Sequence, residues 1–170
     1  MKDNHNMTRR LAMAGVLTAV AVIGGMFSIP IGAAKCSPVQ HMVNVIAGVL
    51  LGPWYAMGSA FVASLIRNLI GTGSLLAFPG SMIGALLAGL LYRYGQKLPY
   101  ACAGEIVGTG ILGALAAVPI AIGLMGRTAA LFAFVPSFLI NTIAGSIVAV
   151  LVVTALNRTS VFRDLRTALR

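Results

Sequence analysis

The fold of this chain depends on one long uncharged stretch. Residues 36–66 read CSPVQHMVNVIAGVLLGPWYAMGSAFVASLI, and no Asp, Glu, Lys or Arg interrupts them. A membrane-spanning helix needs about 20 apolar residues, so the stretch could form one long crossing or two short ones. Gly52 and Pro53 lie near its centre, and a Gly-Pro pair breaks a helix because proline lacks the amide donor. The stretch therefore predicts either two helices joined at Pro53 or one interrupted helix.

Further uncharged stretches lie on both sides of this one. They cover residues 11–34, 68–92, 106–126 and 128–157, and each is long enough to cross a bilayer core. The chain has 170 residues, of which 59% are hydrophobic. We therefore expect an all-α integral membrane protein that forms one helical bundle over residues 1–170, without a soluble domain.

The cations distinguish six crossings from five, because Lys and Arg in short loops stay on the cytoplasmic side. With six crossings, nine of the twelve cations share the side of both termini, namely Lys2, Arg9, Arg10, Arg93, Lys97, Arg158, Arg163, Arg166 and Arg170. The other three, Lys35, Arg67 and Arg127, lie outside. With five crossings, five cations lie on the side of the N-terminus and seven on the other side, which is a weaker bias. The charges favour six crossings with both termini in the cytoplasm.

Prolines and apolar runs give an approximate helix map. The predicted helices cover residues 9–28, 38–52, 53–71, 80–97, 99–125 and 129–157, and an amphipathic surface helix covers 160–170. Pro119 and Pro136 fall inside the fifth and sixth predicted helices, near their external ends, where a kink can separate helices. We therefore expect any cavity in the external half of the bundle.

Polar side chains at membrane depth are candidates for function because burying them in lipid is unfavourable. The candidates for solute binding are Gln40, His41, Asn44, Asn68, Thr72, Ser74, Glu105 and Asn141. Most of them lie near external helix ends, close to Arg67 and Ser81 and to the apolar rings of Phe78 and Phe138. This composition suits a small heteroaromatic solute better than an ion. In a second interpretation, the residues near position 40 cap a short helix or face lipid headgroups.

Glu105 is the one acidic residue within a predicted crossing. A carboxyl group in that position must be paired, protonated or hydrogen-bonded. It could hold a polar group of a solute or bond to a neighbouring helix, and the sequence leaves both roles open. Its predicted depth, two turns from the cytoplasmic end, places it below the external polar residues.

Several other functions find little support. The net charge of +9 is accounted for by membrane orientation and anionic lipid, so we expect no nucleic-acid partner. Cys36 and Cys102 are predicted on opposite sides of the bilayer, so they form neither a disulfide nor a metal site. Residues 108–113 read GTGILG and match a dinucleotide fingerprint, but no strand precedes them. We expect no enzyme, no metal and no cofactor. Residues 9–27 could also form a signal peptide.

Three segments carry a resemblance to a known family. They are PVQHMVNVIAGVLLGPWY at 38–55, IRNLIGTGSLLAFPGSMIGA at 66–85 and GEIVGTG at 104–110. Together they resemble the ThiW family, which comprises substrate-binding S components of energy-coupling factor (ECF) vitamin transporters, and the likeness covers nearly the whole chain. It implies uptake of hydroxyethylthiazole, a thiazole precursor of thiamine, across the plasma membrane of a prokaryote.

The resemblance also implies partners. An S component has no ATPase of its own and works with a transmembrane coupling (T) subunit and two cytoplasmic ABC ATPases. A small-residue motif on its first helix contacts the coupling subunit, and Gly15 and Ala19 match that motif here, with Gly in place of the usual first Ala. The sequence leaves the ligand open to a different precursor, such as the hydroxymethyl pyrimidine. It is also compatible with a membrane scaffold that transports nothing and with a freestanding secondary carrier.

Overall fold

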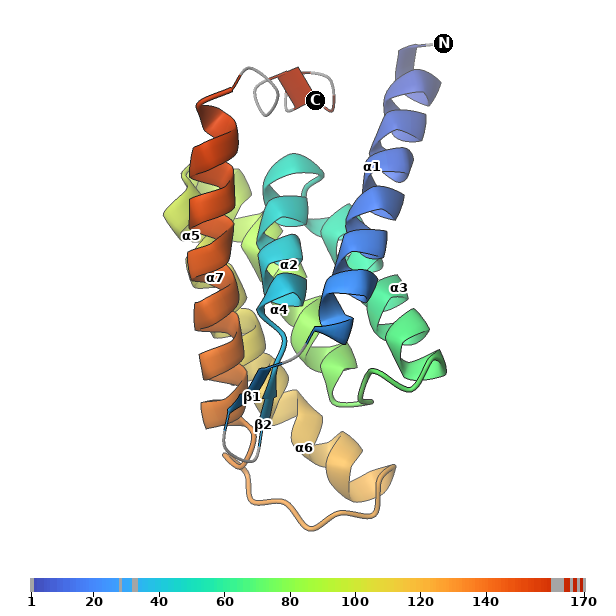
Figure 1. The fold of residues 1–170 in the computed structure, drawn as a ribbon, viewed down its shortest axis with the longest axis vertical. Helices are drawn as coiled ribbons and strands as arrows, with labels where there is room; N and C mark the ends of the chain where they lie inside the picture. Colours follow the sequence, from blue (N-terminus) through green and yellow to red (C-terminus); the bar gives the residue numbers. More distant parts are fainter. Residues whose placement is uncertain are drawn as a thin grey trace.

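The protein is a bundle of helices with one short hairpin (Figure 1). The computed structural model describes residues 2–27, 29–31, 34–159, 164, 165, 167 and 169. The helices are α1 (Lys2–Met26), α2 (Pro38–Leu50), α3 (Pro53–Leu69), α4 (Ala77–Gly95), α5 (Leu98–Val107), the π-helix η1 (Gly108–Gly113), α6 (Ala114–Gly123) and α7 (Val135–Asn157). The antiparallel strands β1 (Ile29–Ile31) and β2 (Ala34–Cys36) join α1 to α2.

Residues 36–66 are divided between two helices, α2 and α3. Gly52 adopts a positive φ of 86°, a conformation that residues with a side chain rarely adopt, and this reverses the chain between the helices. Pro38 and Pro53 occupy the first turns of α2 and α3, where the missing amide proton has no acceptor in the helix. The Gly-Pro pair therefore separates two helices, as one of the two sequence interpretations requires.

Several observed boundaries differ from the predicted ones. The first helix begins at Lys2 rather than residue 9, and α4 begins at Ala77, with Pro79 tolerated in its first turn. Residues 129–134 form no helix, so α7 begins at Val135. Pro136 therefore lies in the first turn of α7 and not in its interior, where the sequence predicts a kink. The hairpin has no counterpart in the predicted map, and most of the predicted surface helix 160–170 lies outside the described residues.

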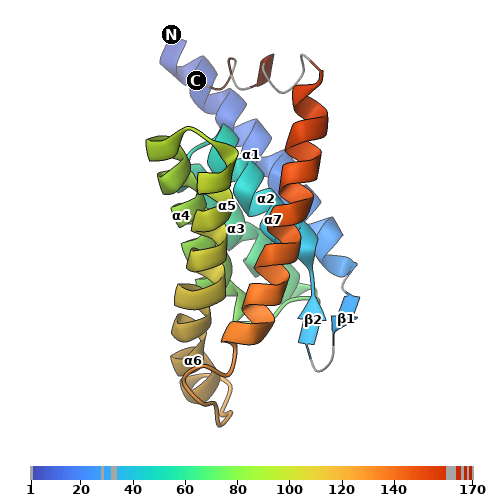
Figure 2. The same ribbon diagram turned by 90° about the vertical axis from the view of Figure 1, so that its left-hand side faces the viewer.

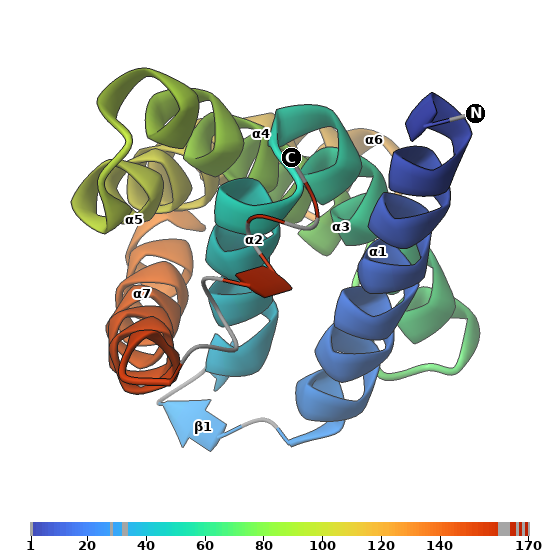
Figure 3. The same ribbon diagram turned by 90° about the horizontal axis from the view of Figure 1, so that it is seen from above.

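Helix α2 is the centre of the bundle. It contacts α1, α3, α4, α5 and α7, which surround it in the view from above (Figure 3). Every residue from Val43 to Leu50 is buried. Many large apolar side chains of the outer helices are exposed instead, including Ile143, Ile147 and Leu151 on α7. An apolar exterior of this kind is suited to lipid rather than to water.

Within the residues that the structure describes, three helical segments are long and apolar enough to cross a membrane, judged by length and composition. They are Asn6–Met26, Leu98–Gly123 and Val135–Asn157, and Pro38–Leu50 is a shorter apolar helix. The second of them joins α5, η1 and α6 into one rod that runs beside α7 (Figure 2). Within this rod η1 has the wider π-helical turn, and π-helical turns in α-helices are frequent at functional sites.

The two ends of the bundle differ in charge. The start of α1, the turn from α4 to α5 and the end of α7 lie at the end that carries both termini (Figures 1 and 2). These segments contain the exposed cations Arg9, Arg93, Lys97 and Arg158. The hairpin, the loop after α3 and the loop after α6 lie at the opposite end. We call the first the terminal end and the second the hairpin end.

Candidate functional site

A cavity of about 380 Å³ opens at the hairpin end of the bundle. Its size falls within the range of about 300–1,000 Å³ that is usual for small-molecule sites. The lining comes from the end of α1, the start of α2, the end of α3 and its following loop, the start of α4, η1 and the start of α7. The lining residues are Gly25, Met26, Ser37, Gln40, His41, Arg67, Gly71, Thr72, Gly73, Ser74, Ala77, Gly80, Ser81, Thr109, Phe138 and Asn141.

A continuous chain of hydrogen bonds lies along this cavity. Gln40 is its first link, because its Oε1 accepts from Arg67 Nη1 and its Nε2 donates to Ser81 Oγ at 2.9 Å. Asn44 is the second link, with its Nδ2 lying 3.2 Å from Ser81 Oγ and 3.1 Å from Glu105 Oε1. Neighbouring polar groups on four helices thereby fix one another's orientation.

Glu105 is the deepest member of this chain. Its side chain is fully buried, and it does not line the cavity. Its Oε1 bonds to Thr109 Oγ1 at 2.9 Å and to Asn44 Nδ2, and it lies 2.8 Å from His41 Nδ1. His41 is 12% exposed and does line the cavity. Glu105 therefore positions the imidazole from behind.

The π-helical segment brings Thr109 into this arrangement. Thr109 lies in η1, and its hydroxyl has two acceptors within reach, Glu105 Oε1 and the carbonyl oxygen of Gly80 at 3.0 Å. Close approach of α4 makes this possible, because a Cβ at Gly108 would lie 2.7 Å from the Cα of Gly84. The segment that matches a dinucleotide fingerprint in sequence is thus a packed helical turn.

The predicted binding residues fall into three groups in the structure. Gln40, His41, Thr72, Ser74 and Asn141 line the cavity. Asn141 reaches it from the second turn of α7, where its Oδ1 accepts from the Ser37 amide at 2.7 Å.

The second and third groups support the cavity from outside it. Asn44 and Glu105 lie beneath it in the hydrogen-bonded chain. Asn68 Nδ2 donates to the carbonyl oxygens of Ser64 and Ser74, at 2.8 and 3.1 Å, and so holds the loop that follows α3. Phe78 packs against Phe61, with ring centroids 5.7 Å apart, whereas Phe138 lines the cavity.

Four polar lining residues lie outside the predicted binding set. Arg67 and Ser81 are visible in the sequence as polar residues at helix ends, and that signal suffices to select them. Ser37 precedes Pro38 in a segment that resembles an ordinary helix start. Thr109 has no sequence signal, because its position depends on the π-helical turn of η1.

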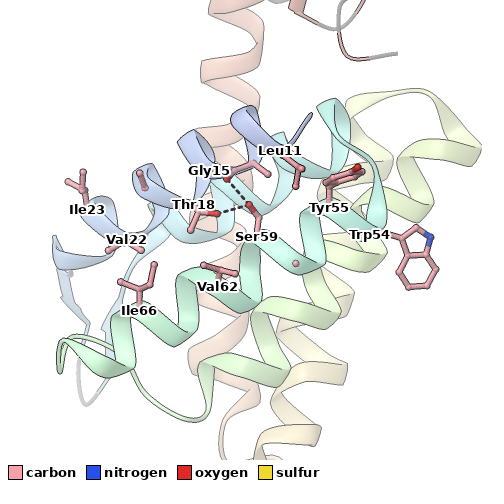
Figure 4. Close-up of a pocket in the computed structure, with 13 residues that line it drawn as sticks. Leu11, Gly15, Thr18, Val22, Ile23, Trp54, Tyr55, Ser59, Val62 and Ile66 are labelled. Carbon is pink, nitrogen blue, oxygen red and sulfur yellow. Dashed lines mark hydrogen bonds between the residues drawn. The ribbon is translucent and has the colours of Figure 1, made fainter. Parts of the chain in front are cut away.

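A second hollow lies on the outside of the bundle between α1 and α3 (Figure 4). This groove has a volume of about 830 Å³, and apolar side chains provide most of its lining. Gly15, Thr18 and Ala19 line it from α1. At its base Thr18 and Ser59 share a hydrogen bond of 2.8 Å, and Ser59 Oγ donates to the Ala14 carbonyl oxygen at 3.0 Å.

The exposed small face of α1 is therefore part of this groove. Gly15 and Ala19 are exposed, and a Cβ at Gly15 would meet no atom within 4 Å. Small residues further along the helix pack inside the bundle instead, because a Cβ at Gly24 would overlap Val39. Glycine in α1 thus allows close packing at one end and leaves an open surface at the other.

The apolar exterior and the cavity at one end describe a multi-pass membrane protein with a site for a small solute. Among the described residues, no group of three His, Cys, Asp or Glu side chains could hold a metal ion. A family model described as thiamine-precursor transporter protein (ThiW) matches residues 11–159. The chain therefore belongs to the ThiW family of thiamine-precursor transporters. No curated protein matches the chain.

Proposed function

We propose that this protein is the substrate-binding S component of an ECF importer and that its ligand is hydroxyethylthiazole. The observation that carries the proposal is the cavity at the hairpin end, where hydrogen-bonding side chains and one aromatic ring, Phe138, share a volume suited to a single small molecule. Gln40, His41, Thr72, Ser74 and Asn141 contact the solute. Glu105 and Asn44 hold this set in place, and Asn68 holds the loop beside it.

In this proposal the chain crosses the membrane six times, with both termini in the cytoplasm. The distribution of cations between the two ends of the bundle supports that orientation. Trp54, Tyr94 and Tyr100 are exposed near the terminal end, as aromatic residues are at a membrane interface. The cavity then faces the outside of the cell, where a solute for import is captured.

The groove between α1 and α3 is the proposed contact for the coupling subunit. A helix of another protein can approach closely where no side chain separates the backbones, and Gly15 and Ala19 provide such a surface. The proposed partners are a transmembrane coupling subunit and two cytoplasmic ABC ATPases, which supply the energy that this chain does not generate.

Calorimetry on the purified, detergent-solubilised protein tests the proposal. Hydroxyethylthiazole, hydroxymethyl pyrimidine and thiamine are titrated separately into the wild-type chain and into His41→Ala. We expect saturable binding of hydroxyethylthiazole that His41→Ala weakens. Arg127→Ala is the control, because Arg127 lies at the same end of the bundle without lining the cavity. If only hydroxymethyl pyrimidine binds saturably, it replaces hydroxyethylthiazole as the proposed ligand. If none of the three compounds binds, the proposed function is contradicted.

A further inference from the structure

The cavity lining contains a buried cation whose described hydrogen-bond acceptors are all neutral. Arg67 lies in the last turn of α3 and is 8% exposed. Its guanidinium donates to Gln40 Oε1 and to the carbonyl oxygens of Gly25 and Thr72, at 3.3 and 3.4 Å. An arginine keeps its charge inside proteins, and removing that charge from water without an anion is costly.

The chain has few anions that could balance this charge. It contains three acidic residues, Asp3, Glu105 and Asp164. The first and third are close to the termini in sequence, and both termini lie at the end of the bundle opposite the cavity (Figure 1). Glu105 Oε1 already bonds to His41, Asn44 and Thr109. Glu105 Oε2 is buried without a hydrogen-bond partner, but among the described residues no carboxylate bonds to Arg67. A direct counter-ion for Arg67 would therefore come from outside the chain.

Two lining groups have unused capacity for hydrogen bonds. Among the described residues, Arg67 Nε and Ser37 Oγ are buried without a hydrogen-bond partner. Both residues line the cavity, together with the hydroxyl-bearing residues Thr72 and Ser74. Charged hydrogen bonds from a guanidinium to a carboxylate or phosphate are roughly twice as strong as neutral ones. The lining thus combines a cation and hydroxyl groups with the aromatic ring of Phe138.

We infer that the cavity binds an oxyanion form of its heteroaromatic ligand, a phosphate ester or a carboxylate, more tightly than the uncharged alcohol, and that Arg67 binds this oxyanion. The inference rests on the proposed function and specifies the charged form of the precursor that the site prefers. The ring packs near Phe138, and the anion takes the place of the missing counter-ion of Arg67.

A purely structural role for Arg67 makes a different prediction. Its bonds connect α1, α2 and the loop after α3, and the C-terminal ends of α1 and α3 carry partial negative charge. These dipoles stabilise the guanidinium but contribute no net charge. A structural Arg67 would affect stability and the binding of every ligand equally, whereas an oxyanion site changes the ratio between charged and uncharged ligands.

The test is calorimetry with matched ligand pairs on the full-length solubilised protein. Hydroxyethylthiazole is compared with its phosphate ester and with a thiazole carboxylate of the same ring, and hydroxymethyl pyrimidine is compared with its phosphate. We expect an oxyanion form to bind at least tenfold tighter than the matched alcohol, with a difference that shrinks as salt rises. The carboxylate and phosphate arms show which oxyanion the cavity accepts.

Variants assign the preference to Arg67. Arg67→Gln should remove the preference for the oxyanion, while Arg67→Lys should keep part of it and Arg127→Gln all of it. If Arg67→Gln does not fold, the inference is tested by the difference in affinity between oxyanion and alcohol, measured in the wild type and in Arg67→Lys. Equal or tighter binding of the uncharged alcohol overturns the inference and leaves the proposed function intact. If neither the oxyanion nor the alcohol of any pair binds, both the inference and the proposed function are wrong. If only the pyrimidine pair shows a preference for the oxyanion, the inference holds and the ligand contains a pyrimidine ring instead of a thiazole.

Discussion

His41 Nδ1 lies 2.8 Å from Glu105 Oε1, although 64 positions separate the two residues in the chain. One member of the pair lines the cavity and the other is fully buried beneath it. The pair connects α2, the central helix, to the rod formed by α5, η1 and α6. A change at Glu105 should therefore reach the cavity through His41 and also weaken the packing of the bundle.

Glu105→Ala should destabilise the protein more than Glu105→Gln does. Alanine removes the acceptor that His41, Asn44 and Thr109 share. Asn44 and Thr109 keep second acceptors in Ser81 and Gly80, so we expect a loss near the lower end of the range of about 1–3 kcal/mol for a buried polar group without a partner. Glutamine retains an acceptor oxygen at that position. Thermal unfolding of the three proteins in one detergent measures the order, and equal midpoints for alanine and wild type would contradict it.

Gly84→Ala should disrupt the site from behind. A Cβ at this position would overlap Thr109 Oγ1 and lie 2.5 Å from Glu105 Oε2, so both side chains must move. Gly58→Ala is the matched control, because its Cβ would meet nothing within 4 Å, and alanine is favoured over glycine in a helix by roughly 0.5–1 kcal/mol. Ligand affinity and unfolding midpoints should fall for Gly84→Ala and hold or rise for Gly58→Ala. Similar behaviour of the two would show that the close approach is unimportant.

Gln40→Ala should mainly reduce ligand affinity, whereas Asn68→Ala should mainly loosen the loop after α3. Gln40 connects Arg67 to Ser81 within the lining, so its loss should weaken ligand binding by about tenfold, or about 1.4 kcal/mol. Asn68 holds the loop through Ser64 and Ser74, so its loss should mainly speed amide hydrogen exchange in residues 70–76. Exchange measured by mass spectrometry and affinity by calorimetry separate the two effects. If hydrogen exchange in residues 70–76 is unchanged in Asn68→Ala, Asn68 does not hold the loop.

Ala19→Leu should impair assembly with the coupling subunit and leave ligand affinity unchanged. A leucine there fills the groove between α1 and α3, whereas Ala12→Leu places the same bulk on an exposed position of α1 outside the groove. Co-purification with a tagged coupling subunit measures the first effect and calorimetry the second. Full assembly of Ala19→Leu would exclude the groove as the contact.

The boundaries that could be predicted are those that local chemistry determines. Pro38 and Pro53 set the starts of α2 and α3, and the Gly52 turn separates them, because these residues restrict the backbone wherever they occur. Pro136 marks no kink inside a helix, because it lies in the first turn of α7, and Pro79 likewise lies in the first turn of α4. Proline is accepted in the first turn of a helix, so its presence does not distinguish a helix start from a position just inside it.

The polar residues of the site could be selected because charge and amide groups are rare in the rest of this apolar chain. Their grouping could not be predicted, because it depends on contacts between helices. Asn68 and Ser74 are both polar residues at the hairpin end, yet the first supports the loop and the second lines the cavity. Thr109 joins Glu105 through the π-helical turn of η1, which no local pattern in the sequence indicates.

Labelling of a single cysteine in intact cells tests the central claim most directly. Ser74→Cys is introduced into a chain whose Cys36 is replaced by serine, since Ser74 is exposed and lines the cavity while the remaining Cys102 is buried. A membrane-impermeant maleimide should label the cysteine at position 74 from outside the cell, and an excess of the thiazole ligand should slow that labelling. Labelling that requires permeabilised cells, or that no thiamine precursor slows, would contradict an outward-facing solute site.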